Sequence, residues 1–168
     1  KIADAGADTQ PYYAAIATRG SSLWYANHAA LVGRAMAVAG ATEQASLFID
    51  SAADAWAFGT DPDIRVSTEF LNDEGELIRW IEPPSPHPRR FLLAAIQLWL
   101  ATDDQVYRQV FDDPEVAAAF SDEVAHFAGR NSTFDIAAVA RHPDLFPDGW
   151  GEQAHAAIIE AADEAASS

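Results

Sequence analysis

The segment "FLLAAIQLWLA", residues 91–101, constrains the fold more than any other part of the chain. Its side chains are apolar almost all round a helix, so the helix cannot lie on a surface with one face in water. The segment is also about half as long as the roughly 20 residues that cross a bilayer. We therefore predict a buried helix from about residue 89 to 101, with the rest of the chain packed around it.

Glycines and small polar residues divide the rest of the chain into further helices. Candidate caps that precede helical patterns are Thr9, Ser21, Thr42, Thr102 and Asp113. Glycine often ends a helix because it adopts the left-handed conformation at no cost. We therefore expect Gly20 to end a short helix from residue 9, and Gly59 to end a helix from residue 42. The same analysis over the whole chain gives about seven or eight short helices.

Two stretches break the helical period. "IRVSTEFL" at 64–71 and "ELIRWI" at 76–81 are rich in β-branched and aromatic residues, and they flank the turn signal "NDEG". This pattern predicts a β-hairpin over about residues 64–81. A lone hairpin is marginally stable in water, so it must lie on helices or pair with another strand or chain. Its edge is therefore a candidate surface for forming a homo-oligomer.

Length and composition predict one domain. A chain of 168 residues with 49% hydrophobic composition can bury a substantial core without disulfides. We expect a single globular domain, residues 1–168, of the α+β class. It is predicted to be a predominantly helical bundle with the one β-hairpin.

The net charge of the chain restricts the classes of partner that it can bind. The formal net charge is −16, from 26 acidic and 10 basic residues, and Lys1 is the only lysine. This balance argues against direct nucleic-acid binding and against anchoring to an anionic membrane. Two interpretations stay open, a solvated acidic surface from compositional or salt adaptation and a surface that meets a basic partner protein. A cytoplasmic location is expected, with a processed or exported form as the alternative because the sequence does not begin with Met.

A repeated Glu-x-x-His spacing is the clearest chemical motif. Glu123 with His126, and Glu152 with His155, place each pair on one helical face. Helical projection directs His155 and His28 toward the core, His126 to the margin of a buried stripe, and Glu123 near its centre. A buried carboxylate must be paired, metal-bound or neutral.

These five residues could form a pocket or a metal site. Without cysteine, oxygen and imidazole ligands remain, which suit zinc, iron or manganese. The competing interpretation, which the residue statistics favour, is a set of hydrogen-bonded core histidines with no cofactor.

Two further groups of residues are candidates for binding. The first group could bind an anion or could pair with surface carboxylates, and it consists of Arg79, Arg89 and Arg90. An aromatic group could pack in the core or anchor an interface, and its members are Tyr12, Tyr13, Trp24, Tyr25 and Trp80.

Two hypotheses for the function of the protein remain. The chain lacks Gly-x-Ser-x-Gly, Gly-x-Gly-x-x-Gly and Walker-type phosphate loops. We favour a non-catalytic acidic protein that binds another macromolecule, as a regulator, inhibitor or immunity-type partner of a basic protein. The alternative is a helical enzyme or small-molecule binder, with or without metal, built on the histidines and Glu123. An exposed apolar groove edged by acids would favour the first function, and convergence of His28, Glu123, His126 and His155 in one pocket would favour the second.

Overall fold

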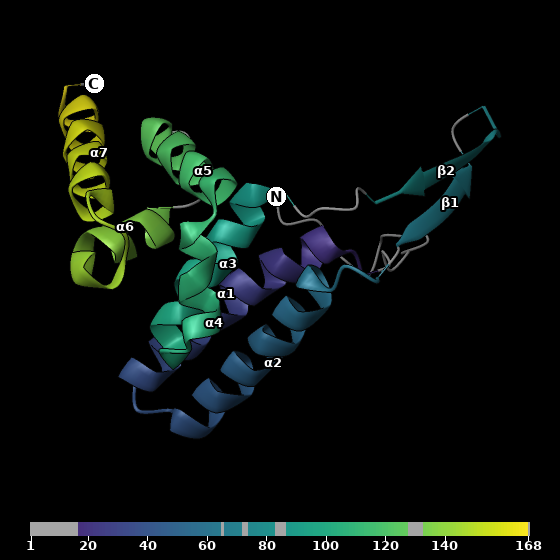
Figure 1. Ribbon diagram of the computed structural model, residues 1–168, viewed down its shortest axis with the longest axis horizontal. Coiled ribbons are helices and arrows are strands. Elements are labelled where there is room, and N and C mark those ends of the chain that lie inside the picture. The colour runs from purple at the N-terminus through teal and green to yellow at the C-terminus, as the bar shows by residue number, and fades with distance from the viewer. Residues whose placement is uncertain (1–16, 65, 72–73, 83–86, 128–132, 168) are drawn as a thin grey trace, which may run out of the picture.

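The computed structural model describes residues 17–64, 66–71, 74–82, 87–127 and 133–167 (Figure 1). Within these ranges the protein is predominantly helical, as predicted, with seven α-helices and two short β-strands. The helices are α1 (Arg19–Val38), α2 (Thr42–Thr60), α3 (Pro88–Thr102), α4 (Gln105–Arg108), α5 (Pro114–Ala125), α6 (Thr133–Arg141) and α7 (Trp150–Ala166). Two 3₁₀ segments, η2 (Gln109–Asp112) and η4 (Pro143–Leu145), lie between them. None of the helices in this part of the chain is long and apolar enough to cross a membrane.

Helix α3 lies at the centre of the core, as the sequence predicts. Every residue from 92 to 99 is buried, including the polar Gln97. Helices α1, α5 and α6 pack around it, and the buried hydrophobic residues of these elements form one cluster. Its ends follow local rules: Pro88 begins the helix, and Asp103 ends it in the left-handed conformation.

Helices α1 and α2 form the closest helix pair, and glycines on both make that approach possible. A Cβ at Gly33 would lie 2.7 Å from the Ile49 side chain and 3.1 Å from the Ala45 carbonyl oxygen. A Cβ at Gly59 would lie 2.7 Å from the Leu23 side chain. The helices therefore touch where side chains are missing, and small residues mark the buried face of α1.

One predicted helix end is wrong and another is displaced by one residue. Gly20 lies in the first turn of α1 and does not end a helix, and α2 ends at Thr60, one residue beyond Gly59. A Cβ at Gly20 would collide with the guanidinium of Arg90. Both glycines serve close packing, which a single sequence cannot distinguish from helix termination. The predicted short helix from residue 9 falls almost entirely on residues outside the described ranges.

The first turn of α1 is held by a carboxylate from a distant segment. The Glu82 side chain, immediately after β2, accepts hydrogen bonds from the backbone N–H groups of Arg19 (2.8 Å) and Gly20 (2.9 Å). Thr18 and Ser21 add a reciprocal capping box at the same end. Because helix N-termini carry unsatisfied N–H groups and partial positive charge, Glu82 stabilises α1 and anchors the end of β2 against it.

The strands β1 (Ser67–Leu71) and β2 (Leu77–Ile81) pair antiparallel, with Ser67 opposite Ile81 and Leu71 opposite Leu77. The structure thus pairs the two segments predicted as strands, while residues 72 and 73 of the predicted turn lie outside the described ranges. Figure 1 shows the pair extending from the helices, away from α7. Leu77 and Ile81 are 64% and 63% exposed, so β2 presents apolar side chains to solvent.

Candidate functional site

The predicted histidine site does not assemble. His28 and His155 are exposed, whereas the sequence analysis directs both toward the core, and His126 is exposed as well. The buried face of α1 contains Leu23, Ala26 and Ala30, so it is rotated by about one residue from the face that carries His28. The physical reason is the close approach of α2, which places alanine and glycine inside and leaves the bulkier residues outside.

The same rotation occurs in α7. Its buried residues are Trp150, Gly151, Ala154 and Ala157, so His155 lies outside. Glu152 is exposed in the first turn of that helix. Among the described residues, no three His, Asp or Glu side chains lie close enough together to hold a metal ion. The five residues predicted as a pocket are therefore spread over three helices.

Glu123 is fully buried, as the sequence predicts, and it is paired. Its carboxylate lies 2.5 Å from Nε of Arg89, whose side chain is 21% exposed. The Arg89 guanidinium also lies over the ring of Trp24, 5.8 Å from its centroid. This ion pair joins α3 to α5, so Glu123 and Arg89 hold the bundle together rather than contributing to the predicted metal or anion sites.

The other predicted binding residues are also placed separately. Arg79 pairs with Glu69 across the strands at 3.5 Å, and both side chains are exposed. Tyr25 is 48% exposed and its hydroxyl hydrogen-bonds Ser51. Tyr12 and Tyr13 lie outside the described residues, as does the side chain of Trp80. Arg79 and Arg89 thus pair with different carboxylates, on β1 and on α5.

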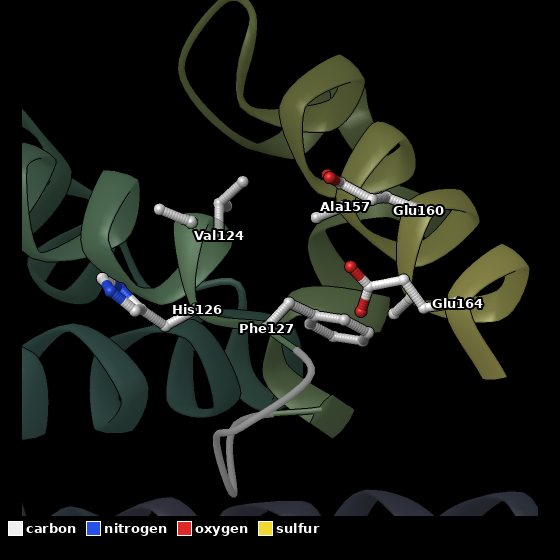
Figure 2. Close-up of a pocket in the computed structure, with 8 residues that line it drawn as sticks. Val124, His126, Phe127, Ala157, Glu160 and Glu164 are labelled. Carbon is white, nitrogen blue, oxygen red and sulfur yellow. The ribbon is translucent and has the colours of Figure 1, made fainter. Parts of the chain in front are cut away.

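A cleft lies between α5 and α7, with a volume of about 210 Å³ (Figure 2). We call this the α5–α7 cleft; it is lined by Val124, Ala125, His126, Phe127, Ala157, Glu160, Ala161 and Glu164. Figure 2 shows the carboxylates of Glu160 and Glu164 directed from α7 into the space beside Phe127, and His126 directed away from it. The cleft combines apolar side chains with two carboxylates spaced one helical turn apart.

A second constellation, which the sequence analysis missed, lies in the core between α1, α3 and α6. Oδ1 of the buried Asp135 accepts hydrogen bonds from Asn27 (2.7 Å) and Gln97 (2.8 Å). Asn27 also donates to the Leu93 carbonyl oxygen at 2.9 Å. The Gln97 oxygen then accepts from Nη1 of Arg34 at 2.5 Å. Three helices are thus linked by one polar chain that runs from the core to a guanidinium near the surface.

Burial dominates the electrostatics of this network. Loss of solvation raises the pKa of Asp135 from 3.8 to about 6, while the hydrogen bonds from Gln97 and Asn27 and the charge of His28 oppose the shift. Burial also lowers the pKa of Arg34, which Asp135 opposes and Arg141 reinforces. An arginine remains protonated at any physiological pH, so Arg34 is a fixed cation and Asp135 is the titratable member.

One sequence signal could have located this network. Gln97 is the only strongly polar residue in the apolar segment 91–101, and a polar side chain in a fully buried helix needs partners. Asp135 gave no comparable signal, because a carboxylate near a helix N-terminus is expected for electrostatic reasons alone. Comparison of the chain with protein-family models, curated proteins and solved structures found no match.

We expect Asp135→Asn to change the pH dependence of stability. Between about pH 4 and 6 the folded protein binds more protons at this site than the unfolded chain, so the contribution of Asp135 falls as pH rises and is constant above about pH 6. The amide can still accept from Asn27 and Gln97 but carries no charge. The unfolding free energy of the variant minus that of wild type should therefore rise by roughly 2–3 kcal/mol across this window. Urea unfolding at several pH values measures it, and a flat difference would contradict the assignment.

Removal of the Arg89 charge should destabilise the fold. Arg89→Met keeps an apolar side chain beside Trp24 but leaves the buried Glu123 without its guanidinium, so we expect a loss of about 2–4 kcal/mol. Arg79→Met is the matched control, because that arginine belongs to an exposed pair worth at most about 1 kcal/mol. Chemical denaturation of both variants checks the prediction, and equal losses would refute it.

Proposed function

We propose that this protein is non-catalytic and acts by binding a basic, amphipathic segment of a partner protein along the α5–α7 cleft. The observation that carries the proposal is the combination of apolar side chains and carboxylates in one exposed cleft. Val124, Phe127 and Ala157 supply apolar contact, and Glu160 and Glu164 supply charge. A helix or strand that presents leucines and arginines or lysines would complement both properties.

The charge of α7 supports this choice of partner. The helix contains four carboxylates and neither lysine nor arginine. Asp163 and Glu164 lie in its last turn, where the helix macrodipole disfavours negative charge. A surface beside the cleft continues this face, and it is lined by Ala156, Ile159, Glu160, Asp163, Glu164 and Ser167. Cationic side chains bound there would offset both the repulsion among the α7 carboxylates and their unfavourable interaction with the helix macrodipole.

The alternative function, an enzyme or small-molecule binder at the predicted histidine site, lacks the convergence on which it depended. His28 bonds the carbonyl of Trp24 within its own helix, and His126 lies beside Asp122 in the last turn of α5. Glu123 is engaged by Arg89. The proposed function therefore rests on the cleft and not on these residues.

A fluorescently labelled helical peptide of leucine and lysine tests the proposal. Wild type should bind it saturably, with affinity that falls as salt is raised. Glu160→Gln with Glu164→Gln should weaken binding about tenfold or more. Asp50→Asn with Asp54→Asn removes two exposed carboxylates at the same spacing on α2 and should change affinity much less. Equal weakening by both double variants would show that only net charge matters and would overturn the proposed site.

The strand pair supports a second proposal, self-association through the edge of β2. Its apolar side chains are exposed, and two strands alone are marginally stable in water. Sedimentation velocity over a range of concentrations should show a dimer that Leu77→Lys weakens. Leu47→Lys is a matched control, because Leu47 is 66% exposed on α2 and Leu77 is 64% exposed. A wild-type protein that stays monomeric at all concentrations would exclude this association.

A further inference from the structure

A groove of about 660 Å³ lies where α1, α3 and α6 meet. We call it the α1–α3–α6 groove; its apolar lining includes Leu31, Val38, Ile49, Leu100, Phe134 and Leu145. Its volume falls within the range of small-molecule sites, about 300–1,000 Å³. It shares no residue with the α5–α7 cleft.

The groove exposes large apolar side chains to solvent. Val38 is 91% exposed and Phe134 is 68% exposed, and Leu145 is 40% exposed. On α1, the burial of Ala26 and Ala30 turns Leu31 and Val38 toward the groove. The Leu145 side of the groove is fixed to α3 by a hydrogen bond from Trp99 to the Leu145 carbonyl oxygen, 3.0 Å.

The groove is also cationic, in a chain of net charge −16. Arg34, Arg141 and His142 line it, and the lining contains no aspartate or glutamate. Within the described residues, neither arginine forms an ion pair with a carboxylate within 4.0 Å, whereas Arg19, Arg79, Arg89 and Arg108 each do. The charges of Arg34 and Arg141 repel one another, while the buried Asp135 behind Gln97 partly offsets the charge of Arg34.

Arg34 is held in place by the buried polar network. Gln97 is fully buried, and it binds Arg34 through its oxygen and Asp135 through its amide nitrogen. Asn27 binds the same Asp135 oxygen from α1. These contacts engage one Arg34 nitrogen and leave the remaining guanidinium N–H groups to bind a ligand. A positioned guanidinium beside a second arginine is the arrangement that binds a carboxylate.

We propose that the α1–α3–α6 groove binds an aliphatic carboxylate, with Arg34 and Arg141 at the carboxylate and the alkyl chain along Leu31, Val38 and Phe134. Charge complementarity selects an anion over a cation, and the apolar lining selects an aliphatic chain over an inorganic ion. This site is independent of the proposed peptide cleft, so either can fail alone.

Octanoate is the probe, with octylammonium as its counterpart of opposite charge and the same chain. Titration followed by amide chemical shifts should show one saturable octanoate site, with the largest changes at Leu31, Ala35 and Ala138. Octylammonium should not shift these amides. Arg141→Gln should weaken octanoate binding at least about tenfold, because it removes one of the two charge-assisted contacts to the carboxylate. Arg141 is exposed, so this variant should keep the fold.

Arg79→Gln is the matched control, since it removes one exposed arginine from the strands and leaves the groove intact. It should leave octanoate affinity unchanged. Equal binding of octanoate and octylammonium would show that the groove is only an apolar surface and would overturn the proposal. Equal losses of octanoate affinity in Arg141→Gln and Arg79→Gln would also overturn it. If octanoate does not bind but an acidic peptide does, with loss in Arg141→Gln, the groove is a protein-docking site and the proposal is wrong.

Discussion

The burial of α3 is the constraint on which the rest of the structure depends. A helix that is apolar on all sides is stable only if neighbours cover every side, and α1, α2, α4, α5 and α6 all contact it. Within this helix Gln97 cannot be solvated, so its amide requires partners in the core. Asp135 and Arg34 meet that requirement, and because Asn27 also donates to Asp135, these contacts fix the relative positions of α3, α6 and α1.

Three buried or half-buried carboxylates are compensated in three different ways. Glu82 accepts from backbone N–H groups at the start of α1, Glu123 pairs with a guanidinium, and Asp135 accepts from two side-chain amides. Amides offset the desolvation of a charge less completely than a guanidinium does, which is consistent with the raised pKa of Asp135. Most of the remaining acids among the described residues lie at the surface.

Much of the helical organisation could be predicted from local signals, and the packing faces could not. Pro88 and the Asp113–Pro114 pair mark the starts of α3 and α5 because proline fits the first helical turn. The face of α1 that carries His28 was predicted to turn inward, and this was wrong by about one residue. The contact with α2 instead selects alanine and Gly33, since close helix packing needs small residues.

The sequence by itself determined the central helix, the predominantly helical class and the burial of Glu123, because these follow from periodicity and desolvation within one segment. Only the tertiary structure decided which faces of α1 and α7 turn inward. That choice moved His28 and His155 to the surface and brought Arg34, Gln97 and Asp135 together from three helices. The physical reason is that a helix face is selected by the shape of its neighbour, which is not encoded within the helix itself.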